Sequence, residues 1–183
     1  MTVTSAPWTS PAPNAKGRVL IQLPLPVLDA LGSGDLQSAS SLSDQNLTPY
    51  LISPECRSVW AMRSTQIKLD AIDAPWVTRL LVNTETGAVV GRAGFHGQPN
   101  QDGMVEIGYS IDPAHRRQGH ARAALEILLK VVREDDRVRT MRASVRPDNV
   151  ASRGLVDQYG FRKVGEQWDE VDGLEVVLEV DVS

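Results

Sequence analysis

Cysteine is almost absent from the sequence, because Cys56 is the single one among 183 residues. One cysteine excludes an intrachain disulfide and any zinc site made of several thiolates, and it is typical of a reducing compartment. The three histidines, His96, His115 and His120, are scattered rather than spaced as metal ligands. We therefore expect a cytoplasmic protein whose site holds no metal.

Long apolar runs and an excess of positive charge are also lacking. No stretch approaches the ~18 apolar residues of a membrane span, and the N-terminus has neither the cationic segment nor the apolar run of a signal peptide. The net charge of −4 gives no general positive field that would attract nucleic acid. The motifs G-x-x-x-x-G-K-[ST] and G-x-G-x-x-G are absent, which disfavours a nucleotide-phosphate binder. We expect a soluble protein that binds neither nucleic acid nor membrane.

The length and composition suit one globular domain. The chain is 42% hydrophobic and 23% charged, which is ordinary for a folded soluble protein. Residues 1–16 differ, because three prolines with serine, threonine and a lone Trp8 cannot bury enough surface to order a segment. We predict a disordered tail over residues 1–16 and a single domain over residues 17–183.

Hydrophobic periodicity predicts helices and strands along that domain. Alternation with a period of two marks the strands, and apolar residues three and four apart mark the helices. The predicted elements, in order, are a strand over residues 18–23, helices near 27–31, over 35–42 and over 54–69, strands over 76–82, 88–96 and 104–111, a helix over 121–132, a strand over 141–145, a helix over 149–158, and strands over 161–168 and 174–182. A strand, a helix and a strand with short connections imply a parallel pair. The expected fold class is α/β with a mixed sheet: an antiparallel meander followed by a parallel strand, helix, strand unit.

Residues 111–121, between a predicted strand and a predicted helix, have the features of an anion-binding loop. The first turn of a helix leaves about four N–H donors without intrahelical partners and carries partial positive charge, so a phosphate fits there. Gly119 lets an anion approach the backbone. Arg116 and Arg117 can fork onto phosphate oxygens.

The pattern Arg116-x-x-Gly119-x-Ala121 after a strand resembles the acyl-coenzyme A signature of the GNAT acetyltransferases. A second block, residues 149–161, is similar to the later Asn-x-x-Ser and Gly-Phe elements of that family. Residues 106–109, Glu-Ile-Gly-Tyr, look like the RimJ/RimL-like branch, the ribosomal-protein N-terminal acetyltransferases. The order of elements resembles the GNAT fold over nearly the whole chain.

This resemblance implies acetyl-CoA as the acetyl donor and a primary amine as the acceptor, with no metal in the reaction. In the family the loop grips the pyrophosphate of the coenzyme, and the pantetheine arm runs along the signature strand like an added strand. The coenzyme-binding residues that it implies are Tyr109, Ser110, Ile111, Arg116, Arg117, Gln118, Gly119, His120, Ala121, Asn149 and Ser152.

Glu106 is the candidate catalytic base. It lies on the opposite pleat from Val105 and Ile107, two residues before Gly108, whose missing side chain could open space beside it. A carboxylate there could deprotonate the amine through a water. The alternative is a carboxylate that merely lies on the polar face of a strand. His96, at the end of a strand, is a weaker candidate for a substrate role.

Ser152 is the candidate proton donor for the leaving thiolate. Many GNAT members place a tyrosine directly after the position of Leu155, but this chain has Val156 there, as is common in the RimJ/RimL-like branch. Tyr159 lies on a different helical face and does not take that role. Ser152 or water must then supply the proton.

We therefore predict an N-acetyltransferase that acts on a protein or peptide N-terminus or on a small-molecule amine, as a monomer or homodimer. The alternative is an acetyl-CoA-binding sensor or assembly subunit without turnover. Measurement of thiol release with a panel of amines distinguishes the two.

Overall fold

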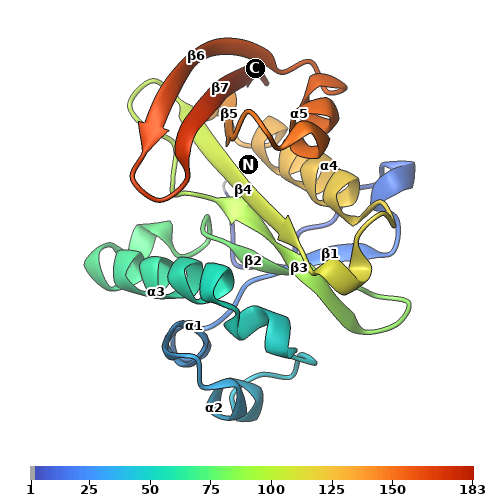
Figure 1. Cartoon of the computed structure of the whole chain (residues 1–183), viewed down its shortest axis with the longest axis vertical. Coiled ribbons are helices and arrows are strands. Elements are labelled where there is room, and N and C mark those ends of the chain that lie inside the picture. The colour runs from blue at the N-terminus through green and yellow to red at the C-terminus, as the bar shows by residue number, and fades with distance from the viewer. Residues whose placement is uncertain (1–2) are drawn as a thin grey trace.

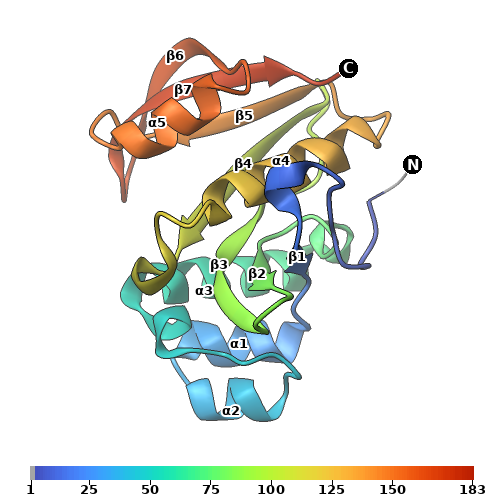
Figure 2. The ribbon, with the colours of Figure 1, turned by 90° about the vertical axis from the view of Figure 1, so that its right-hand side faces the viewer.

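The computed structural model describes residues 3–183 as a seven-stranded mixed sheet with helices on both faces (Figures 1 and 2). The strand order is β1-β2-β3-β4-β5-β7-β6. The strands are β1 (Arg18–Ile21), β2 (Arg79–Asn83), β3 (Ala88–Phe95), β4 (Met104–Ile111), β5 (Thr140–Val145), β6 (Arg162–Asp169) and β7 (Gly173–Asp181). The α-helices are α1 (Leu25–Ser33), α2 (Leu36–Ser41), α3 (Pro54–Leu69), α4 (His120–Arg133) and α5 (Val150–Asp157), with 3-10 turns η1 (Pro13–Ala15), η2 (Pro49–Ile52), η3 (Ala71–Asp73) and η4 (Pro113–His115).

The predicted fold class is confirmed. β1 to β4 form an antiparallel meander. β4 and β5 are neighbouring parallel strands, and α4 is the connection between them. β7 then pairs with β5 and β6 in antiparallel fashion. The helix α3 begins where the sequence predicts, because the Ser53 hydroxyl accepts a hydrogen bond from the Cys56 N–H and Pro54 occupies the first turn.

Two hydrophobic clusters cover the two faces of the sheet. The helix α4 buries a wide apolar stripe, including Leu125 and Leu128, against the strand residues Phe95, Ile107 and Met141. On the opposite face, α1 and α3 pack on the first strands through a second cluster. Figure 2 shows α4 on one side of the sheet and α1 and α3 below it. The second cluster covers only the meander end, so the opposite face of β4 and β5 is left to polar side chains.

The expectation of a disordered tail over residues 1–16 is wrong for the described residues 3–16. Trp8 is buried and pairs with Leu20 of β1 by two backbone hydrogen bonds. The guanidinium of Arg79 lies 3.4 Å from the centre of the Trp8 ring and donates to the carbonyl oxygens of Thr4 and Ala6. These partners are far away in sequence, so local composition could not show them. The first two residues of the expected tail lie outside the described residues, and a single domain over residues 17–183 stays a prediction.

Candidate active site

Strand β4 loses its partner on one edge halfway along its length. Its parallel pairing with β5 runs from Met104 to Ile107, whereas its pairing with β3 continues to Ile111. The β5 side of residues 108–111 therefore has no strand within the described part of the chain. An extended ligand can add to such an edge through backbone hydrogen bonds.

The loop that follows β4 presents free backbone donors at the start of α4. Gly119 is the N-cap residue, with φ of 80°, and no side chain caps the first turn. A Cβ atom built on Gly119 meets nothing within 4 Å, so the space in front of this turn is open. Arg117 and Gln118 are exposed beside it, and Arg117 has a positive φ of 63°. The loop thus has the geometry of an anion site.

Two of the predicted coenzyme-binding residues use their side chains elsewhere. The Nε atom of Arg116 donates to the carbonyl oxygen of Ile111 at 3.1 Å, which ties the loop to the end of β4. The His120 side chain is buried, and its Nδ1 atom accepts from the Nε atom of Arg18 at 3.1 Å. Burial, followed by the nearby Arg18, lowers the pKa of His120. His120 therefore offers a ligand only its backbone N–H.

The structure brings Ser152 and Tyr109 together. Their side-chain oxygens lie 2.8 Å apart, which links α5 to β4 on the side of the sheet that carries α4. Asn149 caps α5, because its Oδ1 atom accepts from the Ser152 N–H at 3.1 Å. Burial raises the pKa of Tyr109. Val156 is fully buried, so α5 contributes no side chain from that position to the pair.

Tyr159 does not join this pair. Its hydroxyl donates to Glu126 and accepts from Arg122, both on α4. Tyr159 lies in the turn after α5, which ends at Asp157, rather than on another face of that helix, and its hydroxyl contacts α4 instead of Ser152.

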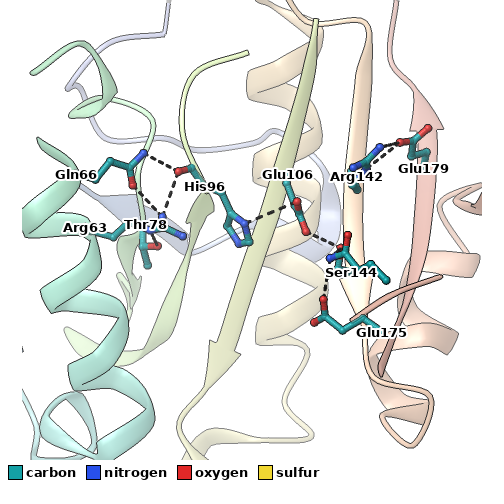
Figure 3. A network of polar contacts seen from close by, with 10 residues as sticks. Arg63, Gln66, Thr78, His96, Glu106, Arg142, Ser144, Glu175 and Glu179 are labelled. Carbon is teal, nitrogen blue, oxygen red and sulfur yellow. Dashed lines mark hydrogen bonds and ion pairs between the residues drawn. The ribbon is translucent and has the colours of Figure 1, made fainter. Parts of the chain in front are cut away.

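Glu106 lies on the opposite face of β4, at the centre of a polar network (Figure 3). The Ser144 hydroxyl of β5 donates to Glu106 Oε1 at 2.6 Å, and His96 Nδ1 lies 3.9 Å from Glu106 Oε2. The Glu106 side chain is only 20% exposed, so it is held within this network rather than free in solvent. Gly108 does leave space beside it, as expected, and the His96 ring fills that space: Nε2 would lie 3.1 Å from a Cβ on Gly108.

The network continues on both sides of Glu106. On one side, Arg63 and Gln66 of α3 donate to the carbonyl oxygen of His96, at 3.1 and 2.7 Å. On the other, the Gln167 amide of β6 donates to Ser144 and to Glu175. None of these partners of Glu106 and His96 is predicted from the sequence. The alternation of residues 141–145 contained the signal for Ser144, since it stands on the polar pleat of that strand.

A further polar contact lies near the end of β4. The Tyr50 hydroxyl of η2 donates to the Ser110 hydroxyl at 2.8 Å. Beside it, Arg92 pairs with Glu55 and lies 3.4 Å from Cys56 Sγ. The side chain of Ser110, a predicted coenzyme-binding residue, is thus engaged on the α3 side, and its backbone belongs to the unpaired edge.

Acid–base groups therefore stand on both faces of β4 where its pairing with β5 ends. Tyr109 and Ser152 lie on the α5 side, and Glu106 and His96 lie on the α3 side. A thioester held along that edge would have hydroxyl donors on one face and a carboxylate with an imidazole on the other. Such an arrangement suits the transfer of an acyl group to a nucleophile.

Among residues 3–183, no group of three or more His, Cys, Asp or Glu side chains could hold a metal ion. No helix among these residues is long and apolar enough to span a membrane.

Comparisons with known proteins agree with this geometry. The family described as acetyltransferase (GNAT) domain matches residues 27–162. The uncharacterized N-acetyltransferase YjdG of Bacillus subtilis is 26% identical over 139 residues, which cover 75% of this chain and 81% of YjdG. Among solved structures, Mycobacterium smegmatis RimJ in complex with CoA-disulfide has a TM-score of 0.63 at 18% identity, over 96% of this chain and 86% of RimJ.

A second solved structure is that of mutant forms of the spermidine/spermine N-acetyltransferase SpeG from Vibrio cholerae. It has a TM-score of 0.63 at 13% identity, over 91% of this chain and 94% of SpeG. At these identities the solved structures show the fold alone, whereas the family match covers most of the chain. The chain therefore belongs to the GNAT acetyltransferases and is an acyltransferase.

Proposed function

We propose that this protein transfers the acetyl group of acetyl-CoA to a primary amine, by direct attack within a ternary complex. The observation that carries the proposal is the unpaired edge of β4 at residues 108–111, with Glu106 on one face and Ser152 on the other. The acceptor is the N-terminus of a protein or peptide, or a small-molecule amine. The single cysteine is consistent with action in the cytoplasm.

Nine of the eleven coenzyme-binding residues proposed from the sequence, all except Asn149 and Ser152, divide into two groups. Tyr109, Ser110 and Ile111 offer their backbone on the unpaired edge to the pantetheine arm. The loop residues Arg116, Arg117, Gln118, Gly119, His120 and Ala121 surround the pyrophosphate, chiefly through backbone N–H groups of the first turn of α4. Asn149 contributes indirectly, because it caps the helix that carries Ser152.

Glu106 and Ser152 have complementary roles in the proposal. Glu106 supplies the negative charge that helps to remove a proton from the acceptor ammonium. It acts through a bridging water or side chain and does not contact the amine itself. Ser152 donates a proton to the coenzyme thiolate and is resupplied through the Tyr109 hydroxyl, 2.8 Å away. The backbone N–H groups of the β4 edge are suited to stabilise the oxyanion.

The experiment is an assay of thiol release from acetyl-CoA with a panel of amines, peptides and aminoglycosides, with product masses confirmed. We expect release that depends on the amine and an acetylated product. Coenzyme binding by calorimetry without release on any acceptor would instead support a sensor or assembly subunit. The Ser152→Ala variant should lower kcat modestly and leave the affinity for acetyl-CoA within about tenfold, since its hydroxyl acts on the leaving group.

A further inference from the structure

The His96 ring lies beside the start of the unpaired edge of β4. Its Nε2 atom would lie 3.1 Å from a Cβ on Gly108, so the ring rests directly over that glycine. Gly108 is the first residue of β4 beyond the last pair with β5. Any side chain at position 108 would push the ring away from the edge. The missing side chain at Gly108 thus leaves room for an imidazole beside the place where a thioester would lie.

The other nitrogen of the ring faces a carboxylate. His96 Nδ1 lies 3.9 Å from Glu106 Oε2, while the second oxygen of Glu106 is occupied by the Ser144 hydroxyl (Figure 3). A carboxylate beside Nδ1 favours the tautomer that carries its proton there, which leaves the lone pair on Nε2. The carbonyl oxygen of His96 is held by Arg63 and Gln66, so the backbone is fixed while the ring remains accessible.

Burial and the surrounding charges together lower the pKa of His96, which favours the neutral ring. Partial burial lowers the pKa of His96, and the guanidinium of Arg63 on α3 lowers it further. Arg92 on β3 acts in the same direction, whereas Glu106 on β4 and Asp169 on β6 raise the pKa. The side chain is still 47% exposed, so an amine in solvent can reach it. A neutral, accessible imidazole is the form that a general base requires.

We propose that His96 is the group that accepts the proton of the acceptor amine, with Glu106 as its positioning residue; this rests on the proposed acetyl transfer. An ammonium group loses two protons when it becomes a secondary amide. The first passes to His96 Nε2 and then to water, and the freed lone pair forms the C–N bond to the thioester carbonyl carbon. The C–S bond breaks with its electron pair on sulfur, and the second proton ends on that sulfur. Glu106 stabilises the imidazolium that forms.

The direct test replaces the imidazole and then returns it from solution. His96→Ala should lower kcat by about 10²-fold or more, in the range of general-base assistance, with the affinity for acetyl-CoA unchanged. Added imidazole should restore much of the lost rate, measured as acetylated amine because free imidazole itself can accept acetyl groups. A variant whose kcat stays within about threefold of wild type, or one that imidazole does not rescue, contradicts the assignment.

A second test moves the ring without changing any ionisable group. Gly108→Ala places a methyl group 3.1 Å from Nε2 and should lower kcat, whereas Gly165→Ala on β6, where nothing lies within 4 Å, is the matched control. Glu106→Gln should shift the acid limb of the kcat profile to lower pH, because the charge that raises the pKa of His96 is gone.

The outcomes separate this inference from the function on which it rests. A wild-type enzyme that acetylates no acceptor overturns the proposed function itself. An active wild type with a fully active His96→Ala variant, and a Glu106→Gln variant that loses about 10²-fold or more, overturns only the role of His96 and makes Glu106 the base.

Discussion

The two faces of β4 differ in what a substitution would change. Val105, Ile107 and Ile111 point into the core beneath α4 and are at most 8% exposed. Glu106 and Gly108, one step along the same strand, face a half-buried polar network. Because the pleat alternates at every residue, neighbouring positions separate the stability of the fold from the chemistry. Substitutions on the two faces should therefore give opposite results.

The largest effect is expected on the apolar face. Ile107→Ala removes buried volume from the main core and should lower the free energy of unfolding by about 2–5 kcal/mol. At a temperature where the variant is still folded, kcat should stay close to wild type. Urea titration measures the first quantity and the thiol assay the second. A variant that unfolds at the wild-type midpoint would show that this face is not part of the cooperative core.

The adjacent position should show the reverse. Glu106→Gln keeps the size of the side chain and its acceptor for Ser144, so the free energy of unfolding should change by less than about 1 kcal/mol. As the partner that positions the proposed base His96, Glu106 should contribute no more than about 10²-fold to kcat, the lower end of general-base assistance. Parallel urea and kinetic measurements check both. Loss of stability without loss of turnover would make Glu106 a structural carboxylate.

A smaller, site-limited effect is expected at the loop after β4. Gly119→Asp places a carboxylate in the open space before the first turn of α4 and should weaken acetyl-CoA binding at least about tenfold, or ~1.4 kcal/mol. The residue must also adopt a φ of 80°, so Gly160→Asp, at 83°, is the control for backbone strain. Calorimetric titration should show the affinity loss only for Gly119→Asp. Equal affinities in the two folded variants would contradict the anion site.

The smallest effect is a pH dependence of stability from the buried start of α4. The pKa of His120 is lower in the folded chain than the ~6.5 of an exposed histidine, so below that pH the unfolded chain binds more protons. Stability should fall as the pH drops through about 6.5 toward the folded value. His120→Asn, whose amide oxygen can still accept from Arg18, should reduce this slope in urea titrations at about pH 5 and about pH 7.5. An unchanged slope would assign the effect to other groups, such as His96.

The fold could be predicted from the sequence where the signals are local. The Ser53-Pro54 pair marks the start of α3, and the alternation of residues 104–111 correctly places Glu106 on the polar face of β4. The contacts of Glu106 could not be predicted. They depend on the register between β4 and β5 and on the path of the chain at His96, which no local pattern contains.

Tyr109 shows a related limit. Alternation placed it with the apolar residues of β4, and it does pack against that core. Its hydroxyl nevertheless meets Ser152 of α5, 43 positions away. A pattern of hydrophobic and polar residues assigns one side to each residue, whereas tyrosine has an apolar ring and a polar tip.

The folded domain extends further toward the N-terminus than the family match does. The family match begins at residue 27, but the buried guanidinium of Arg79 takes two of its acceptors from Thr4 and Ala6 and is covered by Trp8. A shortened chain that begins at residue 17 would lose both of these acceptors and the Trp8 ring that covers the guanidinium. Residues outside the family match therefore help to hold together the sheet that carries the site.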